Sequence, residues 1–172
     1  MRTAFAKLKA SGPRFKELDL GVGVATGEAV VGNFGAKQRF EYSVNGDTVN
    51  FASRLEALTR QLDVRILCDE ESASTSEGVA LFRDLGYARV KGKNKAVRIA
   101  QVLEPGAYDA SFRLNFNEAM AMIASGRLPE ARDLLSKLRE KTDDIATMMY
   151  SDMLGQCREV GGKVKKRQDP AS

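Results

Sequence analysis

The sequence predicts an α+β domain followed by a helical segment. Residues 18–103 alternate short apolar strands with one long amphipathic helix, which is typical of a sheet packed against helices. After Pro105-Gly106 the strand pattern stops, and apolar residues recur every three or four positions. We therefore expect a domain over residues 1–104, a helical extension over 105–160 and a basic, disordered tail over 161–172.

The composition excludes several kinds of site. The 172 residues are 43% hydrophobic and 29% charged, as in a soluble globular chain, and carry a net charge of +4. There is no histidine, which removes the commonest general base and imidazole metal ligands. The two cysteines, Cys68 and Cys157, are too far apart to suggest a disulfide framework or a zinc cluster. No apolar run is long enough for a membrane segment, so we expect a cytoplasmic chain.

The first 34 residues predict a helix and two strands. Within residues 1–16, a helix should end at the Gly12-Pro13 break, and a turn should follow. Two strands, 18–24 and 29–31, should follow and pair across a tight glycine turn. The glycines from Gly21 to Gly27 look superficially like a phosphate loop, but their spacing is wrong and Glu28 stands where such a loop needs lysine. We interpret them as strand and turn.

A helix that begins at Gly46-Asp47 dominates the middle of the chain. Asp47 is its expected N-cap, and a short extended segment, residues 42–44, precedes it. One apolar stripe follows the helical period: Phe51, Leu55, Leu58 and Leu62. Next we expect a strand at 64–67, a short helix at 70–75, and strands at 79–90 and 96–103 joined by a turn at Gly92.

The extension should contain three helices. Phe112, Phe116, Ala119 and Ile123 form one apolar stripe, a second helix begins near Pro129, and a third runs over about 143–159. The first two resemble a single tetratricopeptide-type hairpin, which is too little for an independent array. We interpret them as a C-terminal extension, with a partner-binding module as the alternative.

Two runs carry a specific resemblance: Gly27 to Gly35, and Tyr42 to Glu56, which reads YSVNGDTVNFASRLE. They resemble the catalytic domain of class III adenylyl and guanylyl cyclases, and residues 90–93 with the strand to Val102 are similar to its last hairpin. The resemblance covers residues 18–103. It implies an α/β sandwich with a ferredoxin-like core and an antiparallel sheet, truncated here at its N-terminal side.

The resemblance also assigns roles to five residues. Asn50 would hold the ribose and Arg54 the α-phosphate, where a fixed guanidinium stabilises the charge that builds up during cyclisation. Without the resemblance, these two residues are simply an i, i+4 polar pair beside the apolar stripe. Ser43 and Val44 fall where the family reads the purine. Lys91 matches a lysine that meets the β- and γ-phosphates, although it could also be an ordinary solvated residue.

The family further implies a substrate, a metal and a partner. The substrate would be ATP or GTP, and the metal Mg²⁺ or Mn²⁺, bound by two aspartates expected upstream of this sequence. A second cyclase domain, in a homodimer of the full-length protein, would complete the site, so the chain alone should be inactive. The alternative is a catalytically silent regulatory subunit. Nucleic acid is not an expected partner, because the strands lack interleaved aromatic residues.

Overall fold

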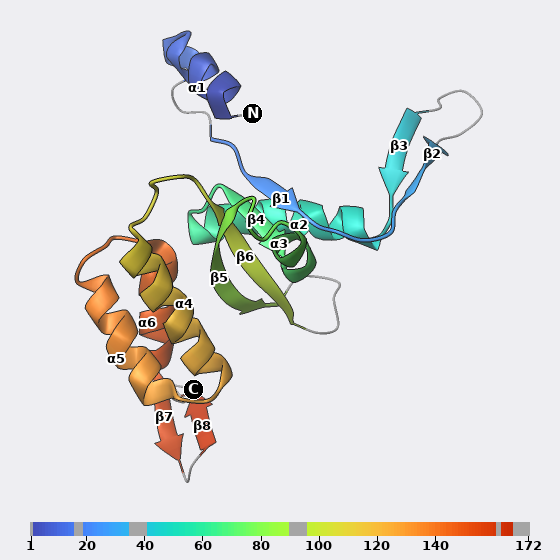
Figure 1. The fold of residues 1–172 in the computed structure, drawn as a ribbon. Helices are drawn as coiled ribbons and strands as arrows, with labels where there is room; N and C mark the ends of the chain where they lie inside the picture. Colours follow the sequence, from blue (N-terminus) through green and yellow to red (C-terminus); the bar gives the residue numbers. More distant parts are fainter. Residues whose placement is uncertain (1, 16–18, 35–40, 90–95, 161–162, 167–172) are drawn as a thin grey trace, which may run out of the picture.

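The chain folds into a small sheet with helices, shown in Figure 1. This computed structural model describes residues 2–15, 19–34, 41–89, 96–160 and 163–166. Its elements in chain order are α1 (Arg2–Ala10), a 3₁₀ turn (Pro13–Phe15), β1 (Val22–Val24), β2 (Val30–Phe34), β3 (Glu41–Asn45), α2 (Asp47–Leu62), β4 (Ile66–Asp69), α3 (Glu70–Thr75), β5 (Leu81–Ala88), β6 (Val97–Leu103), α4 (Ala110–Ala124), α5 (Leu128–Arg139), α6 (Ile145–Gly155), β7 (Cys157–Val160) and β8 (Lys163–Lys166). The predicted α+β class is confirmed.

The main sheet has four strands in the order β1-β4-β6-β5. Strands β4 and β5 both run antiparallel to β6, whereas β1 and β4 are parallel. Parallel neighbours need a crossover, and α2 supplies it between β1 and β4. The sheet is therefore mixed rather than wholly antiparallel.

Helix α2 and the helical extension cover the same face of this sheet. Gly23, Leu67, Gln101 and Arg83 lie opposite one another across the four strands, so their side-chain positions share one face. A Cβ atom at Gly23 would point into α2, while the guanidinium of Arg83 lies over the rings of Tyr108 and Phe116 from the extension. One core can therefore serve both the domain and its extension.

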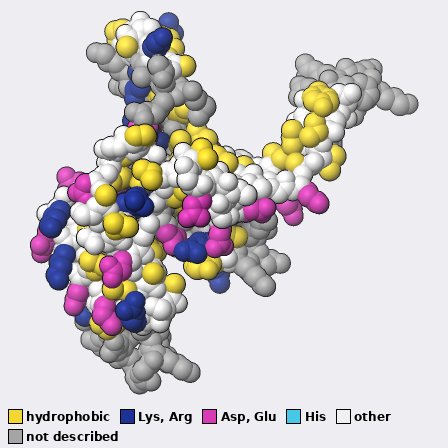
Figure 2. All heavy atoms as spheres, viewed as in Figure 1, with side chains coloured by type: hydrophobic (Ala, Val, Ile, Leu, Met, Phe, Trp, Pro, Cys, Tyr) yellow, Lys and Arg dark blue, Asp and Glu magenta, His cyan; other side chains and the backbone are white. Residues whose placement is uncertain are grey.

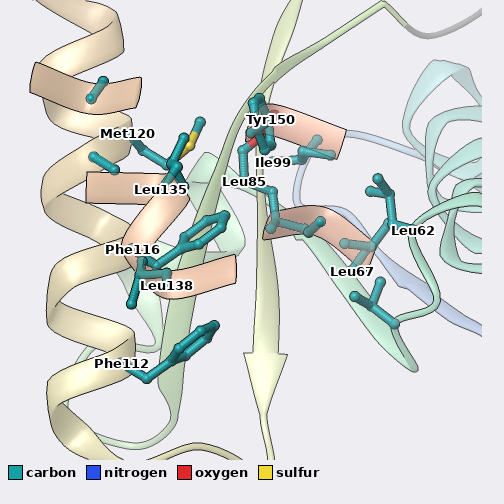
Figure 3. Close-up of a cluster of buried hydrophobic side chains, with 14 of the residues drawn as sticks. Leu62, Leu67, Leu85, Ile99, Phe112, Phe116, Met120, Leu135, Leu138 and Tyr150 are labelled. Carbon is teal, nitrogen blue, oxygen red and sulfur yellow. The ribbon is translucent and has the colours of Figure 1, made fainter. Parts of the chain in front are cut away.

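That shared core is visible in Figure 3. Leu62 and Leu67 lie on one side of the cluster, Phe112 and Phe116 of α4 lie on the other, and Leu85 with Ile99 fills the centre. All six side chains are buried. The packing predicts that the extension and the sheet unfold together, because burial of this apolar surface is the main stabilising contribution to both.

Two glycines allow α2 to lie close to β1. A Cβ atom at Gly23 would overlap the carbonyl oxygen of Ala52 and the backbone nitrogen of Glu56, and one at Gly21 would overlap the hydroxyl of Thr59. The glycine-rich run thus has a packing role, as the strand interpretation expected. It opens no phosphate loop, because Gly23 lies within β1.

Strands β2 and β3 form a separate two-stranded ribbon that projects away from the body in Figure 1. Val31, Val44 and Tyr42 occupy one face of it, because Val31 pairs with Val44 and Tyr42 follows two positions away in register. Their exposed fractions are 53%, 44% and 77%. Figure 2 shows apolar side chains gathered on the projecting arm. An isolated two-stranded ribbon is only marginally stable in water, so this face suits a partner.

Several sequence expectations need correction. Strands β1 and β2 do not form the predicted hairpin: β1 pairs with β4 and β2 with β3, because strand partners depend on contacts distant in sequence. The N-cap of α2 is Gly46, with φ 149° and ψ 167°, and Asp47 is the first helical residue, where its charge still favours the helix terminus.

The expected disorder from residue 161 onward is also wrong for residues 163–166. Strand β8 pairs antiparallel with β7, and the third helix ends at Gly155 rather than near Glu159. Within the described part of the chain, no helix is both long and apolar enough to cross a membrane.

Candidate functional site

Asn50 and Arg54 lie on α2, next to its buried stripe but outside it. Phe51, Leu55 and Leu62 point into the core, whereas Asn50 is exposed and Arg54 is half-buried. Their i, i+4 spacing places both side chains on one side of the helix. Neither side chain makes a hydrogen bond or ion pair with any other residue that the structure describes. The pair is therefore held by a rigid helix yet free to contact a ligand.

The first turn of α2 is fixed from both sides. The backbone nitrogen of Gly46 donates to Oδ1 of Asn45 at 2.8 Å, and the hydroxyl of Thr48 donates to the carbonyl oxygen of Glu28 at 2.9 Å. Gly27, with φ 150°, leaves no room for a side chain beside Thr48. The Gly-Asp-Thr part of the motif therefore sets the position from which Asn50 and Arg54 project.

A second network supports the turn that follows β1. Asp69 caps α3 by accepting from the backbone nitrogen of Ser72 at 2.9 Å, and its other oxygen accepts from the backbone nitrogen of Thr26 at 3.2 Å. The hydroxyls of Thr26 and Ser72 lie 2.8 Å apart. Asp69 is buried, so this carboxylate has a structural role and is not available to a ligand.

Ser43 and Val44 both lie on β3, just before α2, and both are exposed. Adjacent residues of a strand point to opposite faces. Ser43 faces the side of Gly32, and Val44 faces the side of Val31. Both residues therefore come just before the start of α2 in the chain, but their side chains lie on opposite faces of the ribbon.

Lys91 lies outside the described residues. The strands that flank its segment are described: β5 ends at Ala88 and β6 begins at Val97, and the two pair in antiparallel register at these ends. The proposed contact of Lys91 with phosphate oxygens therefore stays a prediction.

The described residues do not fit a magnesium or manganese site. Such a site needs several carboxylates that converge, and among these residues no three acidic or sulfur-bearing side chains could hold an ion together. Asp47 is exposed in the first turn of α2 and has no such neighbours. No catalytic step is therefore derived through a metal on this chain.

A cleft elsewhere in the molecule lies between α3, strands β5 and β6, and α4. Its volume is about 630 Å³, and Arg98, Asp84 and Glu70 form an ion-pair cluster in its wall. Asn50, Arg54, Ser43 and Val44 do not line it. In this single chain Ser43, Val44 and Asn50 are exposed, and Arg54 is half-buried.

No sequence signal marked the most unusual polar residue, Arg83. Its side chain has an exposed fraction of 0% although it comes from the edge strand β5, and its Nη1 lies 2.9 Å from Oδ2 of Asp144. A charged residue within a strand normally predicts an exposed position. The nearest hint was Thr142-Asp143-Asp144 before the third helix, which is typical of an N-cap.

Comparison with known proteins identifies the family that this chain matches and several of its relatives. Residues 1–101 match the family model of the adenylate and guanylate cyclase catalytic domain. Adenylate cyclase 1 of Rhizobium meliloti (strain 1021) is 41% identical over 81 residues, which are 47% of this chain and 12% of that protein. The terminal-differentiation specific adenylate cyclase of Dictyostelium discoideum is 37% identical over 100 residues, 56% of this chain and 5% of that protein.

Among solved structures, a bacterial light-regulated adenylyl cyclase matches with a TM-score of 0.52 and 26% sequence identity, over 69% of this chain and 34% of that one. The fold and the motif on α2 define a class III cyclase type of domain. The chain belongs to the adenylate and guanylate cyclase catalytic domain family. It spans only a small part of the length of the two relatives named above, so the activity of the whole protein is a matter for proposal.

Proposed function

We propose that this chain contributes the transition-state-stabilising half of a nucleotidyl cyclase site that converts ATP, or GTP, to a 3′,5′-cyclic nucleotide and pyrophosphate. The observation that carries the proposal is the placement of Asn50 and Arg54, which share one side of a helix whose start is fixed by hydrogen bonds. Family membership supplies the chemistry, and the named relatives are adenylate cyclases.

In this reaction the ribose 3′-oxygen attacks the α-phosphorus, the 3′-hydroxyl loses its proton, and the bond to the pyrophosphate oxygen breaks. Negative charge builds up on the α-phosphoryl oxygens. A guanidinium already in place, as Arg54 would be, stabilises that charge with little reorganisation. Asn50 would orient the ribose through its amide. The side chain of Ser43 would meet the purine edge, the backbone of Val44 would lie next to it, and Lys91 would contact the terminal phosphates.

The partner is a second cyclase domain. It would bring the metal-binding carboxylates, which the described residues of this chain lack, together with Mg²⁺ or Mn²⁺. The apolar face of the β2–β3 ribbon, with Val31, Val44 and Tyr42, offers surface for it. The same lack of converging carboxylates favours a second candidate function, a catalytically silent subunit that pairs with a complete domain.

A complementation assay tests the proposal. A class III cyclase domain whose own asparagine and arginine are replaced by alanine, but whose aspartates are intact, is mixed with this chain, and cyclic AMP and cyclic GMP are quantified by mass spectrometry. We expect activity to return and to be lost by about 10²- to 10³-fold in Arg54→Ala, the usual effect of removing one preorganised donor. Arg60→Ala, an exposed arginine on the same helix, is the matched control and should stay active.

The outcomes separate the two functions. If the chain co-purifies with the defective domain but restores no cyclic nucleotide, the silent-subunit function is correct and the catalytic one is wrong. Absence of any association would count against both, because each requires a second domain. Restored turnover that survives Arg54→Ala would contradict the assignment of Arg54.

A further inference from the structure

Strand β5 is the outermost strand of the main sheet, and its free edge is covered by the helical extension. An edge strand presents unpaired backbone groups that can recruit another chain. In the sheet order β1-β4-β6-β5, only β6 pairs with β5. Helix α4 packs against β5, and Tyr150 of α6, which Figure 3 shows near Leu85, also reaches this strand.

Two side chains of the extension take the place of a neighbouring strand. Oδ1 of Asn117, on α4, accepts from the backbone nitrogen of Asp84 at 3.0 Å. The hydroxyl of Tyr150, on α6, donates to the carbonyl oxygen of Leu85. Burial, followed by the charge of Asp84, raises the pKa of Tyr150 to about 12, so this hydroxyl keeps its proton and remains a donor at neutral pH. One donor and one acceptor of the edge are thereby satisfied by side chains.

Both contacts fall on a bulge in β5. The register with β6 shifts between Asp84 and Tyr87, and the backbone nitrogen of Gly86 donates to Oδ1 of Asp84 at 2.8 Å. Gly86 has φ 67°, and a Cβ atom there would come within 2.6 Å of Cε of Met120. Helix α4 is therefore pressed against the bulge, which redirects the strand at this point.

Arg83 also joins β5 to the extension, through a side chain that lies on the face of the sheet rather than at its edge. Its guanidinium carbon lies 4.6 Å from the ring centroid of Phe116 and 4.8 Å from that of Tyr108. The carboxylate of Asp144, which it approaches, also accepts from the Tyr108 hydroxyl at 2.8 Å and from the Thr147 backbone nitrogen at 2.8 Å. A desolvated cation against aromatic rings is a stabilising and position-specific contact.

We propose that α4–α6 acts as an internal clamp on the edge of β5, in which Asn117 and Tyr150 hold the bulge at residues 84–87 and Arg83 anchors the strand below it. The clamp closes the edge to other strands and sets the direction in which β5 leaves the sheet. Because β5 and β6 lead to the segment that contains Lys91, a partner that displaced the extension would alter the nucleotide site; this consequence rests on the proposed cyclase function.

Hydrogen exchange of the whole chain, read by mass spectrometry, tests the clamp. The double variant Asn117→Ala/Tyr150→Phe removes both edge contacts and keeps the Tyr150 ring in the core. We expect peptides over β5 and β6 to exchange about tenfold faster, as loss of two partly buried hydrogen bonds implies, while α2 and β1 keep their rates. The matched control is Asn115→Ala/Tyr42→Phe, which changes the same residue types on α4 and on the ribbon strand β3, at positions without edge contacts.

An unchanged exchange rate in β5 would overturn the proposal. Equal acceleration in α2, β1 and β5 would also overturn it, because that pattern means a general loss of stability rather than release of one edge. If the double variant does not fold, Tyr150→Phe alone gives the same comparison. This experiment uses no nucleotide, so a negative result would overturn the clamp without bearing on the cyclase function. The complementation assay with Arg54→Ala tests that function separately.

Discussion

The buried pair of Arg83 and Asp144 gives the most quantitative prediction. The exposed fractions of the two side chains are 0% and 5%, so neither charge is screened by water. Replacing Asp144 by asparagine preserves the acceptor for Thr147 but leaves the Arg83 cation buried without a counter-ion. Removal of one partner of a buried pair usually costs about 3–5 kcal/mol of unfolding free energy. For a chain of this size, that lowers the melting temperature by roughly 6–20 °C.

The reverse change should be milder. In Arg83→Met, Asp144 keeps its hydrogen bonds from Thr147 and Tyr108, so the remaining charge is still partly compensated. We expect a loss of about 1–2 kcal/mol. The double variant Asp144→Asn/Arg83→Met should be more stable than Asp144→Asn alone, because it removes the cation that has lost its counter-ion. The interaction free energy between the two positions should be about 0.5–3 kcal/mol.

Urea unfolding followed by circular dichroism measures all three variants. The control is Asp152→Asn, which removes the exposed Arg139–Asp152 ion pair on the same extension and should cost about 0–1 kcal/mol. If Asp144→Asn costs no more than Asp152→Asn, or if Arg83→Met fails to restore stability in the double variant, the buried pair does not join the sheet to the extension.

Three further predictions concern stability and reactivity. Burial opposes ionisation of Asp144, but Arg83 and Thr147 outweigh it and hold the pKa of this carboxyl below the usual 3.8. The stability that the charged carboxylate supplies is therefore complete above pH 3.8 and is lost as the pH falls through the lower pKa of the folded state. Thermal melts between pH 7 and 3 should show this loss in the original chain but not in Asp144→Asn. Gly23→Ala should cost about 1–3 kcal/mol through overlap with α2, whereas Gly32→Ala, with open space around it, should cost much less in the same urea titration. Burial, then Asp69, raises the pKa of the Cys68 thiol to about 11, so iodoacetamide at pH 8 should label it only after unfolding; rapid labelling of the native chain would show that β4 is accessible.

Local sequence patterns predicted most helices and strands because their causes are local. The stripe from Phe51 to Leu62 predicted α2 and its buried face, and the short helix at 70–75 is α3 at the same residues. The pairing of β1 was missed, because a strand of three residues carries no information about whether β2 or β4 is its partner. That choice depends on α2, whose crossover places β4 beside β1 in parallel.

For the candidate site, too, the sequence predicted the local arrangement of the residues but not their roles. Helical spacing was enough to predict that Asn50 and Arg54 share one side of α2 beside the apolar stripe, and the structure leaves Asn50 exposed and Arg54 half-buried. Their roles, and those of Ser43, Val44 and Lys91, remain proposals. The opposite faces of Ser43 and Val44 follow from strand geometry, which becomes certain only when β3 is known to be a strand.

The sequence alone determined the family, the α+β class and the motif that presents Asn50 and Arg54, because these depend on short runs of residues and their periodicity. Only the tertiary structure decided that the extension is joined to the sheet. Arg83 looks like an exposed charge in the sequence, and Asn117 and Tyr150 look like ordinary helix residues. Their roles arise because the fold places a buried cation, its counter-ion Asp144 and an unpaired strand edge within reach of one another, and no pattern over neighbouring residues encodes contacts between positions 25 to 65 residues apart.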